Sequence, residues 1–269
     1  ITRSFSFQRY TSLLITKDGI NLDPVFSPAP PVDFKYNMDF IGLMKISYDK
    51  KYLITCYGGG TSSRSRVEVC SIDSKTGLID HLYHFKLRYI IPNNPFYRTY
   101  SCEFSPDSKY MYLGGTIYTE DITHVYQYDM QYIEDSAQFI QSYIQVGSGQ
   151  GYRLQLASDG KIYCFLHSPD GNDPSNGLVG IIHKPEKPGL ECNYLPSEFF
   201  IENGIVKSGL VNFVTDFLFR FDFDGLCESD TFTFDPWFFP EPTYIEWNFG
   251  DPLSGIANTS TIPHATHKF

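Results

Sequence analysis

The chain has 269 residues and a formal net charge of −10. Its densest basic stretch, Arg64-Ser65-Arg66, holds two positive charges, whereas a surface that tracks a nucleic-acid backbone needs a concentrated positive face. No apolar run approaches the ~20 residues of a membrane-spanning helix. We therefore expect no nucleic-acid partner and no transmembrane segment. Aromatic residues make up 17% of the chain, with 23 Phe and 20 Tyr, which suits half-buried strand surfaces and predicts an all-β protein.

Residues 1–40 begin with a predicted strand, Ser12–Thr16, and a turn, Lys17–Gly19. Four prolines then favour an extended connection: Pro24, Pro28, Pro30 and Pro31. We interpret this region as the end of a repeat unit whose complete copies follow.

Three segments share one pattern: an apolar run, a polar turn centred on Asp, a Lys and a second apolar run. They are Met44–Ile54, Cys102–Tyr112 and Leu154–Cys164. The central residues Asp49 and Asp107 are 58 positions apart, and Asp107 and Asp159 are 52 apart. Strand-built repeats of roughly 50 residues are typical of β-propeller blades. The sequence thus predicts three blades, at about 41–90, 98–147 and 151–201, plus a remnant before them.

Each unit is expected to hold four strands. Ile133–Tyr143 comes closest to a helical period, but we interpret it as strand plus loop, and the fourth strand of the third unit stays unassigned. The predicted strands are Leu43–Ser47, Tyr52–Tyr57, Val67–Asp73 and Leu82–Leu87, then Ser101–Ser105, Tyr110–Gly114, His124–Asp129 and Phe139–Val146, then Arg153–Leu156, Ile162–Leu166 and Leu178–His183.

The six cysteines show no metal-type spacing such as CxxC. Four of them lie in or beside predicted strands and are expected to be small buried hydrophobes: Cys56, Cys70, Cys102 and Cys164. Cys192 and Cys227 fall in loop-like segments and are the best candidates for a disulfide.

The repeated Asp49, Asp107 and Asp159 are more simply explained as turn residues than as a carboxylate array, because Asp bonds to nearby backbone N–H groups in tight turns. Asp73 and Asp129 are interpreted in the same way, as residues at strand ends.

The segment Asp170–Asn176 offers several oxygen ligands for Ca²⁺, but it lacks the EF-hand spacing, so a solvated loop is the preferred interpretation. His264 and His267 are three residues apart, and strand alternation would split them across two faces. We therefore assign no metal ligand to this chain.

Motifs of nucleophilic, zinc-dependent or phosphate-binding sites are missing from the sequence: Gly-x-Ser-x-Gly, His-Glu-x-x-His and the P-loop. No local signature selects a catalytic triad. No catalytic or cofactor-binding residue is assigned, and no cofactor is expected. Propeller enzymes draw their residues from several blades, so an enzyme remains open.

From about residue 221 the pattern changes. Phe221–Gly225 is taken as a boundary, Thr231–Phe234 alternates like a strand, and Trp247-Asn248-Phe249-Gly250-Asp251 follows. This last motif resembles the Trp-Asp-Phe-Gly-Asp hallmark of PKD domains, Ig-like β-sandwiches of cell-surface proteins, with Asn248 in place of the first Asp. The turn Ser105–Tyr110 resembles WD40-like and lactonase-like propeller repeats. The expected organisation is propeller blades over 1–220 and the first part of a PKD domain over 221–269.

A propeller that leads into a PKD module is similar to large secreted proteins of Bacteroidetes, which are associated with gliding motility or type IX secretion. A closed propeller usually has 4 to 8 blades, and a PKD sandwich is longer than the tail of this chain. The resemblance therefore implies a piece of a longer polypeptide, located outside the cell or on its outer surface.

The leading hypothesis is a non-catalytic binding or scaffold segment that acts in adhesion, gliding or envelope assembly, with a protein or surface glycan as partner. The alternative is a propeller hydrolase or lactonase with its active site in the central channel. A third option is a partner-docking domain of an envelope complex.

Overall fold

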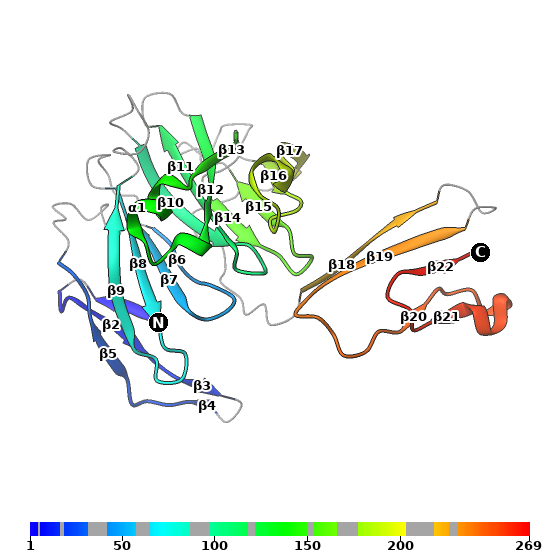
Figure 1. The fold of residues 1–269 in the computed structure, drawn as a ribbon, viewed down its shortest axis with the longest axis horizontal. Coiled ribbons are helices and arrows are strands. Elements are labelled where there is room, and N and C mark those ends of the chain that lie inside the picture. The colour runs from blue at the N-terminus through cyan, green and yellow to red at the C-terminus, as the bar shows by residue number, and fades with distance from the viewer. Residues whose placement is uncertain are drawn as a thin grey trace. The chain divides into compact units, whose positions relative to one another are not determined.

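The protein is described here from a computed structural model and is all-β, as predicted (Figure 1). It divides into two compact units: Ile1–Leu156 with Lys161–Val211, and Ala157–Gly160 with Asn212–Phe269. The structure describes residues 1–4, 6–16, 19–31, 42–57, 65–86, 97–117, 122–149, 153–165, 177–202, 218–225 and 231–269.

Three four-stranded antiparallel sheets of the first unit match the predicted blades, and in each the strands pair in the order of the chain. The fourth strand of the third blade, unassigned from sequence, is β17. The first blade holds β6 (Met44–Ile46), β7 (Tyr52–Tyr57), β8 (Arg66–Ile72) and β9 (Ile79–Phe85); the second holds β10 (Tyr97–Phe104), β11 (Tyr110–Ile117), β12 (Ile122–Asp129) and β13 (Ile144–Ser148); the third holds β14 (Arg153–Leu156), β15 (Ile162–Phe165), β16 (Leu178–Ile182) and β17 (Tyr194–Phe200).

The predicted remnant is a three-stranded sheet of β1 (Thr2–Ser4), β2 (Arg9–Ser12) and β5 (Val25–Pro28), here called the N-terminal sheet. The single strand expected over Ser12–Thr16 is wrong, because β2 ends at Ser12 and a separate hairpin pairs β3 (Ile15–Thr16) with β4 (Gly19–Ile20). Both Leu13 and Leu14 are exposed, so no buried face holds them in the sheet.

The Asp-centred turns have the structural role predicted for them. Asp49 Oδ1 accepts hydrogen bonds from Ser47 Oγ at 2.6 Å and Lys51 N at 3.2 Å. Asp107 Oδ1 accepts from Ser105 Oγ at 2.8 Å and Lys109 N at 3.2 Å. The two turns therefore repeat one hydrogen-bond pattern.

The next turn position also repeats, with a left-handed backbone at Lys50 (φ 61°), Ser108 (φ 57°) and Gly160 (φ 73°). In the third copy Ala157 replaces the Ser, and Gly160 adopts the left-handed backbone without the Cβ penalty. The strand-end residues Asp73 and Asp129 also accept backbone bonds, from Lys75 N and Gln131 N.

The strand predicted over Phe139–Val146 is wrong in its first half. Ser136–Gln141 forms the helix α1, and β13 begins only at Ile144. Asp135 is the N-cap of the helix, since its side chain accepts from the backbone N–H groups of Ala137 and Gln138. The helix places Phe139 in the core, with its ring stacked on Tyr128 at a centroid distance of 5.3 Å.

The main apolar core fills the space between the first two blades. The four cysteines predicted to be small buried hydrophobes are buried, which confirms that interpretation. The core residues include Ile54, Cys56, Val67, Val69 and Phe85 from the first blade, and Cys102, Phe104, Met111, Leu113, Tyr126 and Tyr128 from the second.

The second unit contains a three-stranded sheet of β18 (Leu218–Asp224), β19 (Phe232–Phe239) and β22 (Ala265–His267), and a two-stranded sheet of β20 (Trp247–Asn248) and β21 (Thr259–Ser260). Aromatic rings fill the space between these sheets: the Trp247 centroid lies 5.5 Å from those of Phe221 and Phe234. The predicted boundary between residues 220 and 221 falls inside β18, which pairs with β19 along its whole length.

Candidate functional site

Side chains from all three blades meet along the first strand of each blade. These strands are β6, β10 and β14. β10 lies against both β6 and β14, and we call these three the inner strands (Figure 1). Lys45, Glu103 and Gln155 occupy the same position on them, two residues before the first turn residue of each repeat. The repeat therefore brings an ammonium, a carboxylate and an amide together, and we define these residues as the inner-strand cluster.

Lys45 joins the other two members. Its Nζ lies 2.9 Å from Glu103 Oε2 and donates to Gln155 Oε1 at 3.3 Å. The Lys45 side chain is 10% exposed, and that of Glu103 is fully buried. Gln155 Nε2 donates to the Leu156 carbonyl at 3.0 Å.

The Glu103 carboxylate has further donors on both oxygens. Oε1 accepts from Tyr48 OH at 3.2 Å and from its neighbour Phe104 N at 3.0 Å. Oε2 also accepts from Leu156 N at 2.9 Å. Glu103 therefore satisfies a backbone donor at the edge of β14 while it neutralises Lys45, and it holds three blades to one another.

Two residues before Glu103 on β10, Ser101 makes a second link to β14, because its Oγ accepts from Leu154 N at 3.1 Å. Arg153 is fully buried, and its guanidinium lies 5.6 Å from the centroid of the Tyr100 ring, within cation–π range. The inner strands thus carry charge that is buried and partnered.

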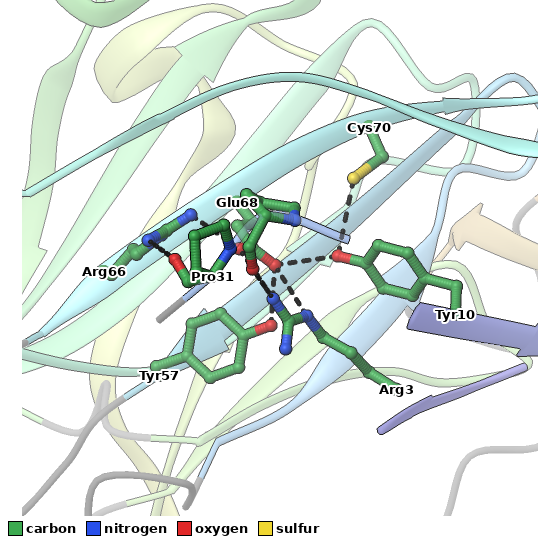
Figure 2. A network of polar contacts seen from close by, with 8 residues as sticks. Arg3, Tyr10, Pro31, Tyr57, Arg66, Glu68 and Cys70 are labelled. Atoms are coloured by element: carbon green, nitrogen blue, oxygen red, sulfur yellow. Dashed lines mark hydrogen bonds and ion pairs between the residues drawn. The ribbon is translucent and has the colours of Figure 1, made fainter. Parts of the chain in front are cut away.

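A second carboxylate, Glu68 on β8, joins the N-terminal sheet to the first blade (Figure 2). Its Oε2 accepts from Tyr10 OH at 2.8 Å and Tyr57 OH at 2.7 Å. Two guanidinium groups flank it, with Arg3 Nε 3.1 Å from Oε2 and Arg66 Nη2 2.7 Å from Oε1. We call these five residues the Glu68 network.

Burial raises the pKa of Tyr10 and of Tyr57 far above the ordinary range, so both phenols stay protonated and donate to Glu68. The Cys70 thiol donates weakly to Tyr10 OH at 3.5 Å, and burial raises its pKa to about 11. The network is therefore built of fixed donors around one acceptor group.

Among the residues that the structure describes, the candidates named from sequence do not gather into one site. His264 and His267 bind different carboxylates, with His264 Nδ1 2.7 Å from Asp235 Oδ1 and His267 Nε2 3.2 Å from Asp251 Oδ2. The loop Asp170–Asn176 lies outside the described residues, so the calcium hypothesis is untested there.

Cys192 and Cys227 were the best candidates for a disulfide, but the Cys192 thiol is free and buried. The segment expected to be a loop is the short 3-10 helix η6 (Gly189–Cys192), which turns the side chain inward, and burial raises the pKa of the thiol to about 11. Cys227 lies outside the described residues.

Sequence reasoning missed both buried carboxylates. A signal for the inner-strand cluster exists, because aligning the three repeats places one polar residue at the same point of each apolar run: Lys45, Glu103 and Gln155. No comparable local signal marks Glu68, whose partner Arg3 is 65 positions away.

Across the part of the chain that the structure describes, no three His, Cys, Asp or Glu side chains gather as metal ligands would. None of the helices in that part is long and apolar enough to cross a membrane.

No family model and no curated protein matches this chain. Among solved structures it is similar to a periplasmic gluconolactonase of Pseudomonas aeruginosa, PpgL, with 15% identity and a TM-score of 0.39 over 94% of this chain and 64% of that one. A second likeness is to prolyl oligopeptidase B of Galerina marginata, with 13% identity and a TM-score of 0.28 over 93% of this chain and 36% of that one. The chain thus spans less than two thirds of the length of either protein.

Proposed function

We propose that this chain is a non-catalytic binding or scaffold segment of an extracellular or cell-surface protein. The observation that carries the proposal is that the two fully buried glutamates of the described residues are surrounded by groups of the fold itself. Glu68 and Glu103 have no exposed surface, and groups of the fold occupy both oxygens of each. A general base or nucleophile needs an oxygen within hydrogen-bond reach of a substrate, whereas these carboxylates hold sheets together.

The binding surface in this proposal is aromatic. Along β18, Phe219, Phe221 and Phe223 project from one face. Phe219 and Phe223 are 62% and 63% exposed, whereas the ring of Phe221, which is 50% exposed, packs against Trp247. Arg220 and Asp222 alternate with them on the other face. Exposed apolar rows of this kind mark contact surfaces, and a protein or a surface glycan is the partner class that suits them.

The second unit supports the PKD hypothesis in one local respect. Asn248, which departs from the PKD motif, accepts a hydrogen bond from Gly250 N at 3.0 Å, as an Asp would. Asp251 in turn contacts His267, whose ring stacks on Phe249 at 4.5 Å. Membership of the PKD family, and with it an origin in the type IX secretion or gliding proteins of Bacteroidetes, remains part of the proposal.

A second candidate function is a propeller hydrolase or lactonase. The observation that favours it is the convergence of Lys45, Glu103 and Gln155 from three inner strands, since propeller sites draw on several blades at the central channel. In this alternative, Lys45 would bind an anionic group and Glu103 would act as the base.

Binding and turnover can be tested on the same protein. We expect the purified chain to bind a glycan or a cell-surface protein in an array, and the double substitution Phe219→Ser with Phe223→Ser, at the two most exposed rings of the row, to weaken that binding at least about tenfold. A matched control is Phe26→Ser, since Phe26 is an exposed aromatic of the first unit. The purified chain should also be assayed for hydrolysis of lactones, glycosides and peptides. If it hydrolyses one of them and a folded Glu103→Gln variant does not, the chain is an enzyme and the hydrolase alternative is correct.

A further inference from the structure

Two cysteines of the main apolar core, Cys56 and Cys102, are not used by the proposed function. Cys56 belongs to β7 of the first blade and Cys102 to β10 of the second, and the two residues are 1% and 0% exposed. Both are members of the cluster of buried side chains between these blades. The pair therefore lies where two sheets pack against each other.

Strand pairing directs both side chains into that core. Cys56 is the cross-strand partner of Val67. Cys102 is the cross-strand partner of Leu113, and both partners belong to the same cluster. Directly opposite residues of an antiparallel pair project from one face of the sheet. The Cys102 Sγ reaches the first blade, because it lies 3.9 Å from the carbonyl oxygen of Ile54, two residues before Cys56 on β7.

The two thiols contact each other through a side-chain hydrogen bond between Cys56 and Cys102. Burial, together with this bond, raises the pKa of the Cys56 thiol well above its ordinary value. The other described thiols have partners of a different kind: Cys70 contacts Tyr10 OH, Cys164 the Ile162 carbonyl and Cys192 the Tyr112 side chain. The bond between two thiols thus sets Cys56 and Cys102 apart from the other described cysteines.

We propose that Cys56 and Cys102 are a disulfide-forming pair, and that their cross-link fixes the first blade to the second when the chain folds under oxidising conditions. The proposal rests on the contact between the two thiols and does not depend on the proposed function. A location outside the cell would supply such conditions, since disulfides form and persist there. The two residues are 46 positions apart, so the bond would restrict the unfolded chain and stabilise the fold.

The oxidant is a second disulfide, such as that of oxidised glutathione. The thiolate of one cysteine attacks it, which forms a mixed disulfide and releases one glutathione thiolate. The thiolate of the other cysteine then attacks the protein sulfur, which forms the Cys56–Cys102 bond and releases the second glutathione thiolate. The protein loses two electrons and two protons, and two reduced glutathiones carry them away. Because both thiols are buried in the fold, we expect the exchange to occur before the blades close.

Disulfide mapping tests the pair directly in the unaltered protein. The chain is refolded from urea in a buffer of reduced and oxidised glutathione, free thiols are blocked in denaturant, and the protein is digested without reduction. We expect mass spectrometry to identify two peptides joined through Cys56 and Cys102. If these cysteines are mostly free, or mostly joined to other cysteines, the proposal is wrong, and this result does not depend on how any variant folds.

Urea denaturation tests whether the link suits the fold. The midpoint of the oxidised protein should lie above that of the same protein after reduction. Cys56→Ala and Cys102→Ala should each abolish this difference, because either one removes a sulfur of the link. The matched control is Cys164→Ala, at a fully buried cysteine of the third blade, which should keep it.

Comparing the two redox forms of each variant cancels the effect of the substitution itself on stability. An oxidised protein that is no more stable than the reduced one would overturn the proposal. A difference that survives in Cys56→Ala or Cys102→Ala would do the same, because the stabilising link would then involve other cysteines.

Discussion

Glu68 and Glu103 are both fully buried glutamates, but the fold surrounds them differently. Glu68 is held by side chains alone, two arginines and two tyrosines, from the N-terminal sheet and the first blade. Glu103 is held by one lysine, one tyrosine and two backbone N–H groups, and it links the inner strands. The first carboxylate neutralises a cluster of charge, and the second completes the hydrogen bonding of a strand edge.

The difference indicates what each site tolerates. Removing the charge of Glu68 leaves two buried guanidinium groups near each other. Removing the charge of Glu103 leaves backbone donors, which a neutral amide also satisfies, and a single lysine that keeps Gln155 Oε1 as an acceptor. We therefore expect the N-terminal sheet to depend on charge, and the inner strands to depend mainly on hydrogen-bond geometry.

The largest expected effect is that of Glu68→Gln. Because it removes the buried carboxylate that pairs with both Arg3 and Arg66, it should lower the free energy of unfolding by about 3–5 kcal/mol. Urea denaturation measures this loss, and Glu191→Gln, at an exposed residue of η6, is the matched control. A loss below about 1 kcal/mol would show that the network does not need its charge.

Glu103→Gln should be milder. The amide oxygen can still accept from Leu156 N, so the expected loss is about 2 kcal/mol, the scale of a hydrogen bond to a charged group. Urea denaturation of both variants shows which substitution lowers the free energy of unfolding more. If Glu103→Gln proved as damaging as Glu68→Gln, the contrast between charge and geometry would be wrong.

A third substitution, Ser105→Ala, tests an uncharged hydrogen-bonding residue in one of the Asp-centred turns. It removes the hydroxyl that donates to Asp107 and accepts from Tyr110 N at 2.9 Å, and we expect a loss of about 1 kcal/mol. Ser47→Ala should lose a similar amount, since Ser47 makes the same two bonds and adds only a long one from Lys51 N at 3.3 Å. Unequal losses would show that the two turns, despite their shared geometry, are not energetically equivalent.

The smallest effect concerns pH. Hydrogen bonds from the backbone and side chain of Gln138 lower the pKa of Asp135 below its ordinary value of 3.8. The stability that this charge contributes is present above pH 3.8 and is lost as the pH falls through the lower folded pKa. Asp135→Asn keeps the N-cap acceptor but does not titrate. The urea midpoints of the two proteins should therefore converge on acidification, and a gap that widens would contradict the sign.

Local sequence patterns predicted the elements well. The strands expected over Tyr52–Tyr57 and Arg153–Leu156 have these bounds in β7 and β14. The repeat also predicted the structural role of Asp49 and Asp107, because turn chemistry depends on residues within a few positions. The helix α1 was missed, although Asp135 gives a start signal, because its six residues are too few to show a periodic apolar face.

The contacts of the candidate site could not be predicted from local sequence patterns, because the residues that make them are far apart in the chain. Lys45 and Gln155 are separated by 110 residues, and Arg3 and Glu68 by 65. Their contacts depend on how whole sheets pack, which a pattern of apolar and polar positions does not specify. A polar residue recurring in the middle of each inner strand is the one feature that pointed to such packing.

The most direct measurement for the central claim uses the double variant Lys45→Met with Glu103→Gln, which removes both charges of the inner-strand cluster and keeps an acceptor for Leu156 N. Removing both partners of a buried ion pair avoids the uncompensated charge that a single substitution would leave. We predict that this protein unfolds in urea within about 2 kcal/mol of the original and binds the same partner with unchanged affinity. If the original chain hydrolyses a lactone, glycoside or peptide, and the folded double variant does not, then the inner strands hold an active site and the scaffold proposal is wrong.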